Sequence, residues 1–187
     1  HTGIKALSDF SLTIKKGEKV LVLGKTGSGK TTLAQLLLRF YDPTSGKITM
    51  GGVPLQQFNV QALRNYTSYV QQDVFLFSDT VADNISFGSK EPVNVDVVKK
   101  AASLAAVDQE IEGFEKGYDT LIGERGVTLS GGQKQRISIA RALLKTPELL
   151  ILDDCLSAVD AKTEHKILNN LAGFLDQKTA IVITPVS

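Results

Sequence analysis

Two adjacent carboxylates, Asp153 and Asp154, directly follow the apolar run 149–152, which has the length and composition of a buried strand. A pair of acids at the end of such a strand typically serves a metal ion and a nucleophilic water molecule. The second acid is an aspartate, so its carboxylate lies one methylene closer to the backbone than that of a glutamate. The pair therefore predicts a metal-dependent site, and the short second acid raises the question of how well that site could activate water.

A glycine-rich loop supplies a second set of chemical groups. Residues 24–31 fit the pattern G-x-x-x-x-G-K-[ST]. They lie between a continuous apolar run at 20–23, which suits a buried strand, and a helical pattern at 31–40. Backbone N–H groups of such a loop, together with the start of the helix, bind phosphate oxygens. Lys30 would place a cation on the β- and γ-phosphates, and the Thr31 hydroxyl could bind Mg²⁺. The alternative is a glycine-rich turn with a solvated lysine, but the strand and helix around the loop favour a phosphate site.

A second helix start has the same character. Residues 129–136 read LSGGQKQR, in which Ser130 is a good N-cap and two glycines follow it. Such a start leaves backbone N–H groups open to an anion. Taken alone, this stretch is either a second anion-binding site or an ordinary capped helix.

The elements that would position these groups follow from the spacing of the apolar residues. We expect strands near residues 10–14, 20–23, 47–50, 67–70, 149–152 and 180–183, and helices near 31–40, 95–107, 133–144 and 162–174. Strand–helix–strand patterns at both ends enclose a mainly helical part, at about 79–144. This order predicts an α/β protein with a largely parallel sheet wrapped by helices, plus a helical lobe.

Composition narrows the class of protein. The 187 residues suffice for one sizeable domain, and 42% are hydrophobic and 22% charged, as in ordinary globular proteins. Lys plus Arg (21) balances Asp plus Glu (20), which gives no reason to expect a nucleic-acid surface. The single cysteine, Cys155, cannot form an internal disulfide. The chain begins at His1 without a methionine and contains no apolar run of about 20 residues, so we expect a segment of a longer polypeptide whose membrane spans, if any, lie elsewhere.

The two glycine-rich motifs together resemble the nucleotide-binding domain of ABC transporters, and the resemblance covers essentially the whole chain. LSGGQ is the signature sequence of that family, and residues 24–31 match its Walker A loop. Gln72 matches the Q-loop glutamine, residues 150–153 the Walker B strand, and residues 157–160 the D-loop. Residues 123–126 are similar to the X-loop of exporters.

The resemblance implies an α/β P-loop NTPase with a RecA-like core at 1–72 and 146–187, and a helical signature subdomain at 73–145. The whole of 1–187 would then be one ATPase domain truncated at both ends. It also implies that ATP and Mg²⁺ are bound. The residues implied to contact nucleotide are Gly24, Lys25, Thr26, Gly27, Ser28, Gly29, Lys30, Thr31, Thr32, Gln72, Ser130, Gly132 and Gln133. Those implied to hold Mg²⁺ are Thr31, Gln72 and Asp153, and those implied in catalysis are Asp154, Gln72 and Lys30.

The resemblance further implies partners. Two such domains meet head to tail, and each ATP lies between the phosphate loop of one and the LSGGQ of the other. A transmembrane domain, upstream on the same polypeptide, would hold this chain at the cytoplasmic face of a membrane and couple ATP to export. No nucleic-acid partner is implied.

Two positions depart from the family pattern. The residue after Asp153 is usually the glutamate that polarises the attacking water, and here Asp154 pulls the carboxylate back by about 1.5 Å. A misplacement of about 1 Å can lower a rate about a hundredfold. After the strand at 180–184 the family usually has a switch histidine, whereas this chain has Pro185, which has no side-chain donor.

Both departures predict a degenerate ATP site, as in one half of heterodimeric exporters, and the intact LSGGQ would complete the site of a different partner chain. One alternative is an aspartate that is an adequate base through a slightly shifted water. Another is a clamp half that binds ATP without hydrolysing it. An ABC-type ATPase acting on DNA or ribosomes is disfavoured, because Lys30 and Ser130 are only 100 positions apart, with no heptad repeat between them.

Overall fold

The computed structural model describes residues 5–89, 91–123 and 126–186, and the chain divides into two compact units. The first unit contains the chain up to Tyr69, Pro147–Asp154 and the stretch from Gln177 onward. The second contains Val70–Thr146 and Cys155–Asp176. Residues 70–72, 146 and 155–176, which were expected in the core, group with this second unit. The division into a RecA-like core and a signature subdomain stays a prediction.

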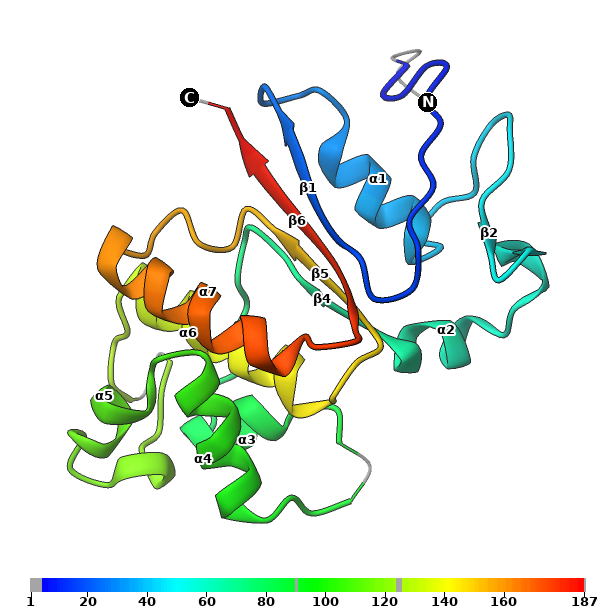
Figure 1. Ribbon diagram of the computed structural model, residues 1–187. Coiled ribbons are helices and arrows are strands. Elements are labelled where there is room, and N and C mark those ends of the chain that lie inside the picture. Colours follow the sequence, from blue (N-terminus) through cyan, green and yellow to red (C-terminus); the bar gives the residue numbers. More distant parts are fainter. Residues whose placement is uncertain (1–4, 90, 124–125, 187) are drawn as a thin grey trace. The chain divides into compact units, whose positions relative to one another are not determined.

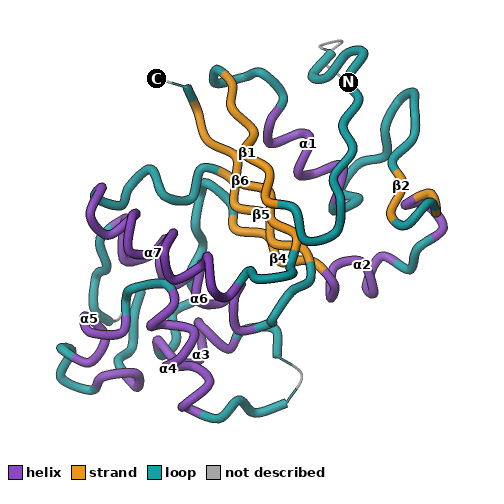
Figure 2. The backbone as a smooth tube through the Cα atoms, in the orientation of Figure 1, coloured by secondary structure: helices purple, strands orange, loops and turns teal. Residues whose placement is uncertain are grey.

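The first unit is built on a four-stranded sheet with the order β1-β6-β5-β4 (Figures 1 and 2). Its strands are β1 (Lys19–Gly24), β6 (Thr179–Pro185), β5 (Leu149–Asp153) and β4 (Thr67–Val70). Strand β6 pairs in parallel with both β1 and β5. The predicted mainly parallel sheet is therefore confirmed. Because the strands are parallel, the phosphate loop after β1 and the acids after β5 lie at the same end of the sheet, where the strands have their carboxyl ends.

Helix α1 (Lys30–Leu37) packs against β1 and β5. The core between them is a cluster of buried apolar side chains: Ala34, Leu38, Ile151, Ile181 and Ile183. The rest of this unit is a short antiparallel pair, β2 (Thr49–Met50) and β3 (Val53–Pro54), then the 3-10 turn η1 (Leu55–Gln57) and helix α2 (Val60–Tyr66). This packing fixes the start of α1 relative to the sheet.

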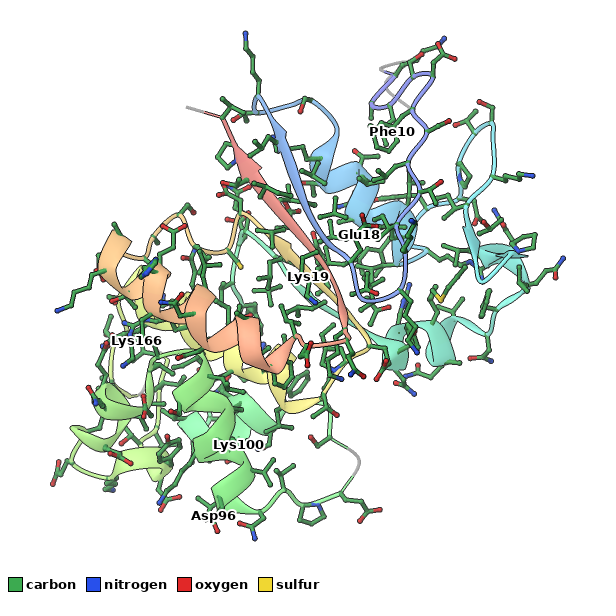
Figure 3. All side chains as sticks on the ribbon, viewed as in Figure 1. Phe10, Glu18, Lys19, Asp96, Lys100 and Lys166 are labelled. Carbon is green, nitrogen blue, oxygen red and sulfur yellow. The ribbon has the colours of Figure 1, made fainter. Side chains whose placement is uncertain are left out.

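Two expectations about the strands are wrong. Residues 10–14 form no strand: in the described part of the chain they pair with no other strand. Phe10 and Leu12 are 49% and 48% exposed. Figure 3 labels Phe10 in this segment. Strand β1 forms, but it is not buried on both faces, because Leu21 and Leu23 are 58% and 57% exposed. Strand β1 lies at an edge of the sheet. Successive side chains of a strand point to opposite faces, so Val22, between Leu21 and Leu23, packs against the core cluster.

The second unit is helical. Its elements are α3 (Val81–Ser86), α4 (Val95–Leu104), α5 (Asp108–Glu112), the 3-10 turn η2 (Gly117–Asp119), α6 (Gly131–Leu144) and α7 (Ala161–Phe174). Helix α6 packs against α3 and α4, and α4 packs against α7, which is why the segment containing α7 belongs to this unit. Arg141 of α6 donates to the backbone oxygen of Asn84 at 2.7 Å and thereby ties α3 to α6. Among the described residues, no helix is long and apolar enough to cross a bilayer.

Side chains cap the starts of most described α-helices. Asn59, Thr80, Asn94, Ser130 and Asp160 each accept a hydrogen bond from an N–H in the first turn of the helix that follows. Helix α1 is different, because its N-cap Gly29 has no side chain to give. The first N–H groups of α1 therefore have no partner within the helix and no capping side chain.

Candidate nucleotide-binding site

The glycine-rich loop between β1 and α1 has a backbone that only glycine permits at two points. Gly27 and Gly29 have φ values of 81° and 87°, in the left-handed region. A Cβ on Gly29 would also lie 2.3 Å from the backbone oxygen of Ala6, and one on Gly24 would lie 2.6 Å from the Ser28 hydroxyl oxygen. Gly29 is therefore required both for its backbone conformation and for space, whereas Gly27 is favoured by its backbone conformation alone.

Lys30 is folded back over this loop. Its ammonium group donates to the backbone oxygens of Gly24 at 2.7 Å and of Lys25 at 2.9 Å. Lys25, Thr26, Ser28 and Thr31 are exposed, and Thr32 is partly buried in the first turn of α1. A cation, hydroxyl groups and the uncapped N–H groups of α1 therefore gather at one end of the helix, which is the donor set that a phosphate group needs.

Asp153 is the last residue of β5 and is only 2% exposed. One of its carboxylate oxygens accepts a hydrogen bond from the Tyr69 hydroxyl of β4, at 3.0 Å. Burial, and then the nearby Asp153 carboxylate, raises the pKa of Tyr69 well above its usual value, so the phenol stays a donor. Sequence reasoning missed Tyr69, because only the pairing of the strands brings it to the acid.

Asp154 follows with an unusual backbone for a residue other than glycine, at φ 47°. Its N–H donates to the backbone oxygen of Ile183 in β6 at 2.8 Å, which fixes the backbone at this point. Burial, and then the adjacent Asp153, raises the pKa of the Asp154 carboxyl, and the Lys30 ammonium lowers it in part. The structure therefore brings Lys30, Asp153 and Asp154 into one site within the first unit.

Pro185 lies beside the phosphate loop. It is the last residue of β6 and stands opposite Gly24 in the pairing with β1. The next residue, Val186, donates its N–H to the Gly24 oxygen at 3.2 Å. The position where the family pattern expects a histidine is therefore next to the first glycine of the loop, and proline has no side-chain donor to offer there.

The LSGGQ segment lies in the second unit, at the start of α6. The Gln133 N–H donates to the Ser130 hydroxyl oxygen at 3.2 Å, and the Ser130 N–H donates to the Gln133 side-chain oxygen at 2.9 Å. This reciprocal pair is a capping box. Across residues 5–89, 91–123 and 126–186, no hydrogen bond uses the N–H of Gly131 or Gly132. Both groups are thus free to meet an anion.

The same helix start touches the segment 157–160, which was matched to the D-loop. A Cβ on Gly132 would lie 2.8 Å from the Ala158 oxygen, so only glycine allows this approach. The Ala158 N–H donates to the Gln135 side-chain oxygen at 3.1 Å, and Gln135 is buried. The signature start and the D-loop segment therefore hold each other in place.

Other predicted positions are distributed differently. Gln72 is exposed in the loop after β4 and belongs to the second unit, so its role toward Mg²⁺ stays a prediction. Of the residues matched to the X-loop, Glu124 and Arg125 lie outside the described residues. Cys155, the single cysteine, is buried.

The residues of the first unit fit ATP with Mg²⁺. The loop needs glycine for its shape, the first turn of α1 has no capping side chain, and Lys30 supplies a cation. Thr31 and Asp153 supply oxygen atoms, which are the ligands that Mg²⁺ prefers. Asp153 already has a fixed hydrogen-bond donor in Tyr69, which leaves its second oxygen for a hydrated ion.

Comparisons with known proteins agree with this geometry. The family model of the ABC transporter matches residues 7–157. The chain is 49% identical over 178 residues to the probable multidrug resistance ABC transporter ATP-binding/permease protein YheI of Bacillus subtilis, and it is 48% identical over 177 residues to the ATP-dependent lipid A-core flippase of Alkalilimnicola ehrlichii. Each match covers 95% of this chain and 30% of the relative.

A solved structure gives the same result. A bacterial Atm1-family ABC exporter with ATP bound superposes with a TM-score of 0.85 at 41% identity, over 90% of this chain and 30% of that one. The expected P-loop NTPase fold is therefore confirmed. The chain belongs to the ABC transporter family, as an ATP-binding domain of the kind found in exporters.

Proposed function

We propose that this chain binds ATP and Mg²⁺ in an exporter and hydrolyses the ATP at its own site only slowly. The observation that carries the proposal is Asp154. Its backbone is fixed by the hydrogen bond to Ile183 and by its left-handed conformation, so the main chain does not move forward to compensate for a shorter side chain. The carboxylate then lies about 1.5 Å short of where a glutamate would place it.

Pro185 supports the same conclusion. It stands beside Gly24, at the strand end where a histidine would reach a phosphate, and it has neither a side-chain donor nor an N–H. The two positions that would act on the γ-phosphate and the attacking water, 154 and 185, thus both have less suitable side chains than the family pattern. The groups that would bind the phosphates of ATP, by contrast, are retained in the loop 24–31 and in the first turn of α1.

Roles for the other residues follow from the site. The loop residues 24–32 bind the phosphates, with Lys30 on the β- and γ-phosphates. Thr31, Asp153 and Gln72 would hold Mg²⁺, which would neutralise negative charge that develops on the phosphates. Asp154 would orient the attacking water, at a rate limited by its reach.

Partners follow from the intact signature. Ser130 and the free N–H groups of Gly131 and Gly132 would complete the ATP site of a second nucleotide-binding domain in a head-to-tail dimer. Because this chain's own site is weakened, the partner is a different chain with a competent site. The chain spans 30% of relatives that are named as ATP-binding/permease proteins, so a transmembrane domain on the same polypeptide would place it at the cytoplasmic face of a membrane.

A second candidate function is a clamp that binds ATP and never hydrolyses it. Asp154 and Pro185 together favour this clamp, because they replace the glutamate and the histidine of the family pattern. Each replacement would weaken hydrolysis, and neither would weaken ATP binding. The two candidates differ only in whether the site turns over at all.

The test is the identity of the nucleotide held by this chain in the full-length protein with its natural partner. After incubation with Mg²⁺ and a photoactivatable radiolabelled ATP analogue, the nucleotide crosslinked to this chain is separated from that on the partner and identified. Slow hydrolysis predicts mainly ATP on this chain, with ADP rising over many turnovers of the partner, whereas a clamp predicts ATP alone. ADP at the same fraction on both chains from the start would overturn the proposal, and Lys30→Ala gives the background labelling.

A further inference from the structure

We propose that Glu110 is a positioning residue for the signature segment: through Gln133 and Arg136 it holds the start of α6 so that the N–H groups of Gly131 and Gly132 face a phosphate. The proposal rests on the proposed function, because the phosphate belongs to ATP held by the partner domain. Glu110 lies on the short helix α5, outside every motif that the sequence revealed.

Glu110 makes contacts with two residues of α6. One carboxylate oxygen accepts from the Gln133 side-chain nitrogen at 2.9 Å and from an Arg136 terminal nitrogen at 3.0 Å. The other oxygen accepts from the second terminal nitrogen of Arg136 at 2.5 Å. This is a two-pronged arginine–carboxylate contact, whose geometry fixes orientation as well as distance.

Both ends of the Gln133 side-chain amide take part in these contacts. Its oxygen accepts from the Ser130 N–H, and its nitrogen donates to Glu110. Gln133 therefore fixes the cap of α6 and keeps a second amide N–H for a ligand. The Ser130 hydroxyl and the N–H groups of Gly131 and Gly132 face the same helix start.

Arg136 extends the same support to the glycines. It is 8% exposed, and its Nε donates to the Gly132 oxygen at 3.2 Å while a terminal nitrogen donates to the Ala106 oxygen at 2.8 Å. Glu110 thus stands at the centre of a network that ends on Ser130 at one side and on Gly132 at the other. The carboxylate also compensates the buried charge of Arg136, so removing it disturbs both packing and orientation.

The experiment separates these two effects in the full-length protein with its natural partner. Amide exchange of Ser130 and Gln133 is measured without nucleotide, and the rate of Mg²⁺-ATP hydrolysis by the complex is measured at saturating ATP. The variants are Glu110→Ala, Glu110→Gln, Gln133→Ala and the Glu110→Ala/Gln133→Ala double variant. Glu115→Ala is the matched control, since Glu115 is an exposed acid three residues after α5 ends.

We expect Glu110→Ala to speed exchange at Ser130 and Gln133 and to lower turnover about tenfold, as the loss of a hydrogen bond to a charged group would. The ATP concentration that gives the half-maximal rate should change less than about twofold, since no phosphate-loop residue is altered. Glu110→Gln, which keeps an acceptor oxygen, should restore part of the rate. In the double variant the Gln133 change should add much less than it does alone, because the two residues act on the same helix start.

Three results would overturn the proposal: unchanged exchange at Ser130 and Gln133 in Glu110→Ala, turnover equal to that of Glu115→Ala, or fully additive effects of Glu110→Ala and Gln133→Ala. Failure of the proposed function is distinct, since it would show in the unaltered complex, either as ADP on this chain at the same fraction as on the partner or as no ATP retained or hydrolysed. The exchange measurement needs no nucleotide and therefore still reports whether Glu110 holds the helix start.

Discussion

Two helix starts in this chain are built from glycine-rich sequence, and they are completed in opposite ways. The N-cap of helix α1 is Gly29, which has a left-handed conformation and no capping side chain. The N-cap of helix α6 is Ser130, which forms a capping box that Glu110 supports from a neighbouring helix. The N–H groups at the start of α1 are therefore uncapped and open to a ligand. At the start of α6 the protein's own side chains form the cap (a finished helix start), and two N–H groups, of Gly131 and Gly132, have no partner among the described residues.

The difference shows how one physical device serves two purposes. An uncapped start costs stability, since a good N-cap contributes about 1 kcal/mol, but it leaves several N–H groups to close around a phosphate. A capped start keeps its shape without a ligand. We therefore expect the α1 start to hold ATP in this chain and the α6 start to present a rigid edge to ATP held elsewhere.

Lys30→Ala should give the largest effect. It removes the cation that lies over the loop, and the loss of charge-assisted hydrogen bonds to phosphate should weaken ATP binding about tenfold to a hundredfold. Calorimetric titration with Mg²⁺-ATP measures it, with Lys47→Ala as control because Lys47 is exposed and distant in sequence from the loop. Equal affinity in the two variants would mean that Lys30 does not contact phosphate.

Gly132→Ala should lower ATP turnover by the full-length complex on the order of tenfold, because small misplacements of a positioning group are costly. Its Cβ would lie 2.8 Å from the Ala158 oxygen, so the helix start or the D-loop segment must shift. Gly173→Ala is the control, since a Cβ there would meet nothing within 4 Å and Gly173 lies on α7, outside the signature segment. A steady-state assay should therefore separate the two alanines, and equal rates would contradict the described contact.

Ser130→Ala should lower the free energy of unfolding by about 1 kcal/mol, because it removes the cap of α6. Ser28→Ala, in the uncapped loop, should change it by less than about 0.5 kcal/mol, since Ser28 caps no helix. Denaturant unfolding of both variants measures the contrast. If Ser28→Ala cost as much as Ser130→Ala, the distinction between an open and a finished helix start would fail.

A smaller effect should appear with pH. The hydrogen bonds from Arg136, above all, hold the pKa of Glu110 below its ordinary value of 4.5. A carboxyl with a lowered folded pKa contributes stability above the unfolded value, and that contribution is lost as pH falls through the folded value. The stability difference between the unaltered chain and Glu110→Gln should therefore hold from pH 7 down to about 5 and shrink below about 4.5. A difference that stayed constant down to pH 3 would contradict the ion pair.

Local patterns predicted most of the elements in this chain. Strand β4 occupies residues 67–70 as expected, and α6 and α7 begin within two residues of their predicted starts, because capping residues mark them. Residues 10–14 alternate like a strand but find no partner, and alternation alone cannot supply one. Strand β1 is less buried than its apolar run suggests, because its place at the sheet edge depends on the whole topology.

The candidate site divides along the same line. Continuous motifs located Lys30, Asp153 and Ser130 directly. Tyr69 and Glu110 were missed, since each reaches its partner only after folding, across 84 and 26 positions of sequence. Neither residue belongs to a motif or a regular spacing that could have identified it from the sequence. Both contact a motif residue from a neighbouring helix or strand. Supporting residues of this kind are found from contacts alone.

The central claim is that the reach of Asp154 limits hydrolysis at this chain's own site, and Asp154→Glu tests it most directly. The full-length protein is assembled with a natural partner whose own site is inactivated at its phosphate-loop lysine, and Mg²⁺-ATP turnover is measured. We predict very slow turnover with Asp154 and a rise on the order of a hundredfold with glutamate, with ATP affinity unchanged. Brisk turnover by the unaltered chain, equal to that of Asp154→Glu, would show that the aspartate is a competent base and would contradict the account.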